Sequence, residues 1–287
     1  MSARVCVSVE TPGQLEAVLD AGKMPERLYL PLSAFLSGAG RNSEGWNQEL
    51  PRLSRVEKTE LFAALPYVLR EEQGKQGLSD ITEVLLLERE SGLPVRGALA
   101  RNLEELAYLR DAGYPGTLEA DYTVPIWNAA ALAEASALFD EWTLSPELDW
   151  HEMEELLREA ALSDGENPQR HAALVVYGRV PMMVSAGCVR KTAGVCRGTE
   201  REVRHTEVLR DRKGKLLTVT TDCRACYNVI RNAVPTSLHR YRKEAERLAV
   251  GRFRIDLTVE SSEEAAAVLA GRYPGETTAG RFKDGVE

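Results

Sequence analysis

The feature that most constrains the fold of this chain is a regular alternation of short β-branched or aromatic runs with longer amphipathic stretches. Strands that alternate with helices in this way form parallel sheets built from βα units. The pattern repeats eight times along the 287 residues, which predicts a (β/α)8 barrel of the TIM type. The predicted strands are Arg4–Val9, Arg27–Leu32, Glu60–Leu65, Val95–Ala100, Thr117–Tyr122, Glu141–Pro146, Ala172–Tyr177 and Phe253–Glu260.

Several helix starts can be predicted from their capping residues. Thr11 precedes a proline and Gln14, which is the pattern of a capping box with proline at the first helical position. Asn102 and Ser261 precede two further stretches with glutamates in the first turn, so we expect them to cap helices as well. Segments 36–55 and 71–80 are polar and contain glycine, and we expect loops there.

A long insertion separates the seventh and eighth predicted strands and spans residues 178–252. Loops that follow the strands of a barrel lie at the carboxyl ends of the strands, where the active sites of this fold are built. We therefore expect residues 1–287 to form a single barrel-like domain, with the insertion at 178–252 on its catalytic face.

The insertion holds four of the five cysteines, Cys188, Cys196, Cys223 and Cys226. The last two form a C-x2-C pair, whose thiolates can converge on one ion or cluster with little change in the backbone, and the first two supply a second pair. Four thiolates suit a closed zinc site as well as a 4Fe-4S cluster, so spacing leaves both open and slightly favours zinc. The fifth cysteine, Cys6, lies in an alternating apolar run, which indicates a buried thiol.

Composition and charge limit the compartment and the partners that can be expected for this chain. The sequence shows no charged-then-apolar leader and no apolar span of about twenty residues, so we expect a cytoplasmic protein with no membrane contact. In a reducing compartment, clustered cysteines favour metal over disulfides. Residues 188–254 contain 17 Lys plus Arg against 7 Asp plus Glu, a local charge of +10 in a chain of net charge −8. This basic island predicts a polyanionic partner such as RNA, unless it is only a solvated surface balanced by the acidic body.

Four stretches follow one another in order: Val176–Cys188, Cys196, Leu209–Gly214 and Cys223–Asn228. Together they resemble the cysteine core of the bacterial collagenase-like peptidase family U32. Arg101–Leu106 and Phe253–Glu260 also resemble the C-terminal half of the long members of that family, so the resemblance covers most of the chain. The N-terminal half of those members is missing, and we expect either a dissected domain or a partner subunit that supplies it.

The resemblance implies a function that differs from the family name. The better understood relatives bind a 4Fe-4S cluster and support oxygen-independent hydroxylation of ribosomal RNA, of the transfer RNA wobble uridine or of ubiquinone precursors. Prephenate is implicated as the oxygen source in the RNA branch. Carried over to this chain, the metal ligands are Cys188, Cys196, Cys223 and Cys226. Full cysteine ligation leaves no iron open to substrate, which favours electron transfer or structural support over Lewis-acid chemistry.

Polar residues close to the cysteine core are candidates for binding substrate or supporting the cofactor. Arg179 could hold a carboxylate or phosphate as a fork, or make a surface ion pair. Tyr177 could stack on a base, or belong to the core as strand aromatics usually do. Asn228 could donate to a cluster sulfur or cap the helix expected to follow it.

Four further residues complete the candidate set. Asp121 and Arg96 lie near predicted strand ends and are expected to face the barrel mouth. Asp211 and Arg212 could contact substrate, or form a turn before Lys213.

Peptidase chemistry has little support in the sequence. His151-Glu152 begins like the helix of zinc peptidases, but Glu155 stands where the second histidine is needed. The G-x-S-x-G elbow of serine hydrolases is absent from the sequence. The resemblance therefore implies an iron–sulfur protein of the U32 type that supports hydroxylation, with an rRNA or tRNA pyrimidine as the expected substrate. The alternative is a zinc-stabilised, non-catalytic module that binds RNA or protein, and a peptidase is the third possibility.

Overall fold

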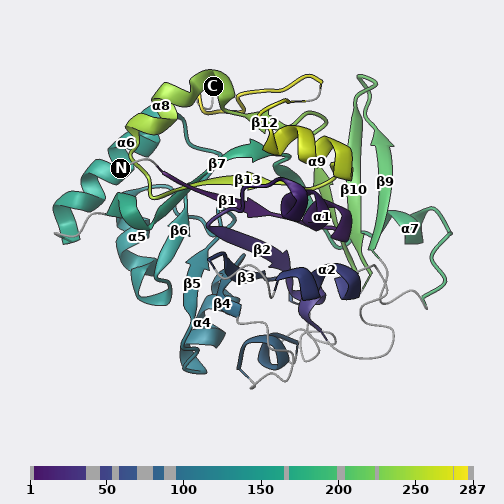
Figure 1. Cartoon of the computed structure of the whole chain (residues 1–287), viewed down its shortest axis with the longest axis horizontal. Helices are drawn as coiled ribbons and strands as arrows, with labels where there is room; N and C mark the ends of the chain where they lie inside the picture. Colours follow the sequence, from purple (N-terminus) through teal and green to yellow (C-terminus); the bar gives the residue numbers. More distant parts are fainter. Residues whose placement is uncertain are drawn as a thin grey trace.

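The computed structural model describes residues 3–36, 46–53, 58–69, 80–86, 95–164, 168–198, 204–223, 226–273 and 275–283. At its centre, eight parallel strands form a closed barrel (Figure 1). They are β1 (Arg4–Ser8), β2 (Arg27–Pro31), β3 (Glu60–Ala64), β4 (Val95–Ala100), β5 (Thr117–Ala120), β6 (Glu141–Thr143), β7 (Ala172–Gly178) and β13 (Arg252–Asp256). They pair in that order and β13 returns to β1, which confirms the predicted (β/α)8 barrel.

Several predicted strands run past the observed ones at their carboxyl ends. β6 ends at Thr143 rather than Pro146, and β13 ends at Asp256 rather than Glu260. The residues just beyond these ends are still buried: Leu144 is 1% exposed and Leu257 is 0% exposed. The apolar pattern therefore continues from the strands into the loops of the barrel mouth, and periodicity alone places the strand ends too late.

Helices surround the barrel (Figure 1). They are α1 (Pro12–Asp20), α2 (Trp46–Leu53), α4 (Leu103–Asp111), α5 (Ala129–Ala135), α6 (Trp150–Asp164), α8 (Arg242–Arg247) and α9 (Ser262–Leu269). The predicted caps are present, since Thr11 and Gln14 form a complete capping box, Asn102 caps α4, and Ser261 begins α9 with a second capping box. Each such cap contributes about 1 kcal/mol by satisfying N–H groups that the first helical turn leaves without partners.

The loop prediction for segment 36–55 is wrong in part, because α2 lies inside it. Trp46 and Leu53 at the two ends of α2 are each 4% exposed, so burial of these side chains fixes a helix in a segment of polar composition. Most of the second predicted loop, 71–79, lies outside the described residues.

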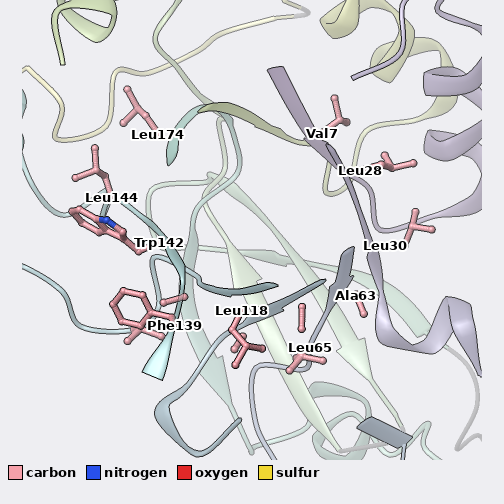
Figure 2. Packing of buried hydrophobic residues seen from close by; sticks show 14 of the residues in the cluster. Val7, Leu28, Leu30, Ala63, Leu65, Leu118, Phe139, Trp142, Leu144 and Leu174 are labelled. Atoms are coloured by element: carbon pink, nitrogen blue, oxygen red, sulfur yellow. The ribbon is translucent and has the colours of Figure 1, made fainter. Parts of the chain in front are cut away.

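Two apolar layers hold the fold together. The larger one lies between the outer face of the barrel and the helices, and Figure 2 shows its members Val7, Leu28, Leu30, Leu118 and Trp142. The smaller one lies inside the barrel and consists of Cys6, Tyr29, Phe62, Ala64 and Leu99. Alternation along each strand sends successive side chains to these two layers, and each fully buried large side chain contributes about 1.5–3 kcal/mol.

Charged side chains fill the rest of the barrel interior near the amino ends of the strands. Arg27 donates to Glu119 at 2.8 Å, and Arg252 donates to Glu141 at 2.7 Å. Burial acts to raise the pKa of Glu119, but Arg252, Arg27 and Arg254 outweigh it and lower the pKa to about 2. Every charge in this network has an opposite partner, which a buried ion requires.

The insertion between β7 and β13 forms a second, antiparallel sheet. Its strands are β8 (Pro181–Ser185), β9 (Arg204–Arg210), β10 (Leu216–Asp222) and β11 (Tyr227–Arg231), in the order β8-β11-β10-β9. A short helix, α7 (Val189–Thr192), follows β8, and β12 (Thr236–Ser237) pairs with β7 of the barrel. Figure 1 shows the β9–β10 hairpin standing at one side of the barrel with α7 beside it. Gly178, at φ +156°, ends β7 where the chain leaves for the insertion, and a Cβ there would lie 2.8 Å from Asp256.

Candidate metal centre

Strand pairing brings the four clustered cysteines to one end of the inserted sheet. Asp222 at the end of β10 pairs with Tyr227 at the start of β11, so Cys223 and Cys226 lie in the turn between these strands. Ser185 at the end of β8 pairs with Asn228, which places Cys188 just beyond the same end. Cys196 lies on the connection that leads to the start of β9, and Arg204 there pairs with Asp222. The four cysteines, which are up to 38 positions apart in the sequence, therefore lie at the same end of the inserted sheet.

No disulfide joins any of the four clustered cysteines, and each is partly exposed. Cys226 has φ +52°, a left-handed conformation that is rare outside glycine, and its Sγ donates to the carbonyl oxygen of Cys223 at 3.7 Å. Among the residues that the structure describes, no three His, Cys, Asp or Glu side chains already converge in a geometry that holds a metal ion. The thiols are gathered at one end, and binding a cofactor would require their side chains to close on a common point.

The thiols of the two cysteine pairs influence one another. Burial, followed by the charges of Cys188 and Cys196, raises the pKa of the Cys223 thiol to about 11, although Arg190 acts in the opposite direction. Mutual repulsion of thiolates is the condition that a bound cation relieves. Four thiolates are soft donors, and four of them at one end of the sheet suit either zinc or an iron–sulfur cluster.

Asn228 fixes the loop that carries Cys188. Its side-chain Nδ2 donates to the carbonyl oxygens of Gly187 at 2.9 Å and Ser185 at 3.3 Å, and its Oδ1 accepts from the N–H of Val189 at 3.5 Å. The Thr221 hydroxyl donates to the same Oδ1 at 3.1 Å. Asn228 is fully buried, so its amide holds the residues on both sides of Cys188. The expected cap of a following helix is not formed, because Asn228 lies within β11.

The Cys196 connection is tied back to α7. The N–H groups of Val195 and Cys196 both donate to the carbonyl oxygen of Arg190, at 3.0 and 3.2 Å. The Arg190 guanidinium in turn donates to Glu207 of β9 at 2.7 Å. The loop that carries Cys188 and Cys196 is thereby attached to both edges of the sheet.

The residue after Cys226 connects the cysteine end to the barrel. Tyr227 OH accepts a hydrogen bond at 3.2 Å from the N–H of Tyr67, which follows β3, and the two rings meet edge to face at 6.5 Å. The Arg101 guanidinium, at the carboxyl end of β4, lies 4.1 Å from the centre of the Tyr67 ring. Arg101 also donates to Asp121 at 3.4 Å. Contacts therefore run without a break from the cysteine turn to the barrel mouth.

A second connection is charged. Glu10 follows β1, and its carboxylate forms ion pairs with Arg204 of β9 and Arg231 of β11. The Arg231 side chain is 1% exposed, and it also donates to the carbonyl oxygen of Arg179 at 3.3 Å. Burial lowers the pKa of Arg204 to about 10, with a further contribution from the charge of Arg231. The inserted sheet is therefore held over the barrel by buried or partly buried charges.

Asp121 lies at the mouth, as expected from its strand end. It accepts from Arg254 at 2.7 Å, and Arg254 also donates to Asp256 at 2.8 Å. Burial raises the pKa of Asp256; Arg254 opposes that shift and the charge of Asp121 adds to it. Arg96, by contrast, is the second residue of β4 and is exposed. Because the barrel strands are parallel, Arg96 lies at the amino end, away from the mouth, and its predicted placement is wrong.

Tyr177 and Arg179 are committed to contacts within the protein. Tyr177 is 1% exposed, its ring stacks on Tyr273 at 5.6 Å, and its hydroxyl donates to Glu260 at 3.1 Å, so it is a core residue and no base can stack on it. Arg179 donates to the carbonyl oxygens of Asn232 and Ala233, and its Nε lies 3.8 Å from Glu260.

Asp211 and Arg212 lie in the β9–β10 turn, at the opposite end of the hairpin from the cysteines. Asp211 Oδ1 accepts from the N–H groups of Lys213 and Lys215, both at 2.8 Å, so its carboxylate organises the turn. At about 3.3 Å per strand residue, the turn lies about 20 Å from the cysteine end.

Sequence reasoning missed the residues that dock the sheet. Glu10, Tyr67 and Arg101 each follow a barrel strand at its carboxyl end, which is the position where functional side chains of this fold are expected. That position was a usable signal for all three. Their partners Tyr227 and Arg231 could not be found in this way, because the strands of the insertion were not predicted.

The fold and the cysteine end define a (β/α)8 barrel with a cysteine-bearing sheet inserted after its seventh strand. In a comparison with solved structures, the U32 peptidase Mk0906 matches with a TM-score of 0.50 and 13% identity, over 91% of this chain and 95% of that one. The Bacillus cereus spore cortex-lytic enzyme SleL matches with a TM-score of 0.46 and 12% identity, over 95% of this chain and 75% of that one. At such identity the likeness to the U32 peptidase concerns the fold.

Sequence comparisons add no further relatives. No protein-family model matches the chain, and no curated protein does. Among the described residues, none of the helices has the length and apolar character needed to span a membrane.

Proposed function

We propose that Cys188, Cys196, Cys223 and Cys226 bind a 4Fe-4S cluster and that the protein supports an oxygen-independent hydroxylation. The observation that carries the proposal is the placement of all four thiols at one end of the inserted sheet, next to the tyrosine that docks this end on the barrel. Thiolates are the usual ligands of such clusters. When bound, the cluster would supply single electrons to chemistry at the barrel mouth.

The residues around the thiols have distinct tasks in this proposal. Asn228 positions the loop of Cys188, and Arg190 positions the loop of Cys196. Tyr227 and Tyr67 pack between the cysteine turn and the mouth, where they exclude water from one side of the site. Arg101, which is partly exposed at the carboxyl end of β4, would orient a polar substrate, and the buried ion pairs of Asp121 with Arg101 and with Arg254 would hold its guanidinium in place.

A closed zinc site is the second candidate. It is favoured by the C-x2-C pair in the turn between two antiparallel strands, a setting that zinc ribbons also use. In that case the thiols would stabilise the inserted sheet, and the protein would bind RNA or another protein without catalysis.

The proposed substrate is RNA, with a pyrimidine of rRNA or tRNA as the modified base. The basic island divides in the structure: Arg231, Arg252 and Arg254 are each 1% exposed and serve internal ion pairs. The cations that remain exposed near the hairpin turn, and therefore support RNA binding, are Arg210, Arg212, Lys213 and Lys215. A partner subunit and prephenate as the oxygen source stay predictions from the resemblance.

The hydroxylation is tested by nucleoside mass spectrometry of RNA from cells that lack the gene. We expect a hydroxylated pyrimidine to disappear, to return with the native protein, and to stay absent with Cys226→Ser. The same variant should lose the cofactor while circular dichroism shows a folded barrel, because a metal site in an insertion organises mainly its own loop. An unchanged nucleoside profile in the deleted strain would contradict the RNA proposal.

Binding of RNA is tested separately from its modification. Affinity for a structured RNA should fall steeply with added salt. Arg212→Glu with Lys213→Glu should weaken binding and reduce the salt slope by about 2, because each substitution leaves one phosphate group without its cation. Binding that ignores salt and both substitutions would remove the hairpin turn from the proposal.

Proteolysis is the third and weakest candidate. The described residues include a Ser237–His239 contact, with Oγ and Nδ1 2.9 Å apart. Ser237 is only 3% exposed, however, so its hydroxyl is not presented to a peptide. A defined cleavage that survives replacement of all four clustered cysteines, or depends on one of them as the nucleophile, would favour a peptidase over the cluster.

A further inference from the structure

An exposed tryptophan lies on the face of the barrel where this fold binds its substrates. Trp127 is 57% exposed and belongs to the loop that runs from the carboxyl end of β5 to α5. Every other Trp, Tyr and Phe side chain that the structure describes is buried or half-buried. A tryptophan ring offers a large flat surface for binding, so one that stays in water on the carboxyl face is a candidate contact for the substrate.

The loop holds Trp127 outward on a fixed backbone. Val124 and Ile126 are each 2% exposed, so they anchor the loop to the core while Trp127 faces solvent. The N–H of Ile126 donates to the carbonyl oxygen of Val124 at 2.7 Å. Asn128, directly after Trp127, caps α5 by accepting from the N–H of Ala131 at 2.8 Å. Because the backbone is fixed on both sides of the ring, little further ordering is needed when a ligand binds to it.

Further aromatic side chains and a guanidinium lie on the neighbouring loops. The Thr123 hydroxyl donates to the carbonyl oxygen of Arg101 at 2.7 Å, which joins the β5 loop to the end of β4. Tyr122, directly before Thr123, is half-buried, and the Arg101 guanidinium lies over the half-buried ring of Tyr67. Since β3, β4 and β5 are parallel neighbours, these side chains and Trp127 follow adjacent strands at the same end of the barrel.

This combination of side chains indicates the class of ligand. Aromatic rings next to a guanidinium are what proteins use to hold the unpaired bases of single-stranded nucleic acid. A protein partner fits the surface less well, because a stable interface covers about 800 Å² on each side. The exposed residues closest to Trp127 in the sequence are Thr123, Pro125 and Asn128, which are small or polar and add no wide apolar patch.

We propose that Trp127 is the stacking platform for an unpaired base of the substrate RNA, an inference that rests on the proposed function. The stacked base holds the strand at the rim, where Arg101 on the adjacent loop meets the neighbouring nucleotide. Figure 1 shows α5, which begins two residues after Trp127, and the β9–β10 hairpin on opposite sides of the barrel. The platform and the cations of the hairpin turn therefore contact different parts of one RNA.

The experiment measures the affinity of the holoprotein for a labelled oligouridine by fluorescence anisotropy. Trp127→Leu should weaken binding about tenfold, whereas Trp127→Phe should keep most of the affinity because it keeps an aromatic ring. Stacking releases no counterions, so the loss in Trp127→Leu should be the same at low and high salt. The same RNA paired with its complement should not respond to Trp127→Leu, because its bases are already stacked inside the duplex.

Two control variants separate stacking from other effects. Leu162→Ala removes a side chain that is 78% exposed near the end of α6, and its affinity should stay within about twofold of the native value. Arg212→Glu with Lys213→Glu should reduce the salt slope, which Trp127→Leu should leave unchanged.

Tryptophan emission gives a direct reading of the stacked base. The chain contains four tryptophans, and the emission that Trp127→Phe removes is that of Trp127. Oligouridine should quench this part of the emission and leave the remainder unchanged. Quenching of equal size in the native protein and in Trp127→Phe would contradict stacking on Trp127.

The outcomes separate this inference from the proposed function. Native affinity for oligouridine in Trp127→Leu, or an equal loss in Leu162→Ala, would overturn the platform and leave the RNA proposal to the hairpin turn. Failure of the native protein to bind any RNA would overturn both. Unchanged RNA affinity together with a shift from dimer to monomer on sedimentation would assign Trp127 to a contact between copies of the chain. Loss of affinity in a protein that holds zinc would support the platform and overturn only the hydroxylation.

Discussion

Arg231 of the inserted sheet and Glu10 of the barrel form an ion pair in which the arginine side chain is 1% exposed and the glutamate 11%. Arg204 of β9, which β10 separates from β11 in the sheet, approaches the same carboxylate. One carboxylate thus balances two cations at the junction of the two sheets. Removal of that carboxylate would leave Arg204 and Arg231 close together at the buried junction, without the negative charge that balances them.

Glu10→Gln is therefore expected to lower the free energy of unfolding by about 2–3 kcal/mol, somewhat below the usual cost of breaking a fully buried pair. Urea unfolding measures the loss of free energy. In the variant, the amide hydrogens of β11 should exchange faster than those of β2. Glu26→Gln is the matched control. It breaks the more exposed pair with Arg4 and should cost less than about 1 kcal/mol. Equal costs for the two variants would contradict the docking role of Glu10.

Glu119 gives the barrel interior a predictable response to acid. Its pKa is about 2 in the folded protein, against an ordinary value of 4.5. Because the folded value is the lower one, the ionised carboxylate stabilises the native state above about pH 4.5, and this contribution is lost as the pH falls toward 2. Glu119→Gln should therefore be clearly less stable than the native protein at pH 7 and approach it near pH 3. A difference that does not change with pH, in urea titrations followed by circular dichroism, would contradict the account.

Glu105 responds in the opposite sense. It is buried on α4, where it accepts from the N–H of Arg101 at 2.7 Å, and burial raises its pKa to about 8. Its neutral form stabilises the native state fully below about pH 4.5, and this contribution is lost as the pH rises toward 8. Glu105→Gln resembles the neutral form, so from pH 5 to pH 8 the native protein should lose about 3 kcal/mol relative to the variant. Parallel stability curves would show that Glu105 is ionised throughout.

Asn228 is expected to control occupancy of the metal centre without controlling the barrel. Asn228→Ala removes the bonds to Gly187, Ser185 and Val189, so the loop of Cys188 should loosen and the metal content of the purified protein should fall by at least about tenfold, as for other residues that orient ligands. Asn128→Ala is the control, because Asn128 caps α5 through the same kind of bond, at 2.8 Å to Ala131.

The control variant should lose about 1 kcal/mol of stability and keep its metal. If both asparagine variants retain metal equally, Asn228 does not position the ligands. If Asn228→Ala unfolds the barrel as well, the cysteine sheet and the barrel are one cooperative unit.

The barrel was predictable because its strands repeat one rule. Each is a short apolar run between helix caps, and successive residues such as Cys6 and Val7 alternate between the two apolar layers. Caps at Thr11, Asn102 and Ser261 were predictable for the same reason, because they depend on residues only three positions apart. Strand ends were less predictable, since burial continues into the mouth.

The inserted sheet was not predictable from local pattern. Met183 and Leu209 are apolar but exposed, so their strands do not show the alternation of a half-buried sheet. Their pairing depends on contacts between distant residues, such as Asn228 with Ser185. The cysteines were found because metal chemistry restricts residue type and spacing more tightly than packing does. Arg96 was misplaced although the predicted strand Val95–Ala100 already put it at the amino end, because in a parallel barrel only residues at the carboxyl ends of the strands reach the mouth.

The central claim is that the four cysteines of the inserted sheet bind an iron–sulfur cluster. It is tested most directly by metal and acid-labile sulfide analysis of protein purified without oxygen. The account predicts about four irons with matching sulfide per chain, as one complete four-cysteine site allows. One zinc without sulfide would contradict it, make the site structural, and remove the chemical basis for hydroxylation.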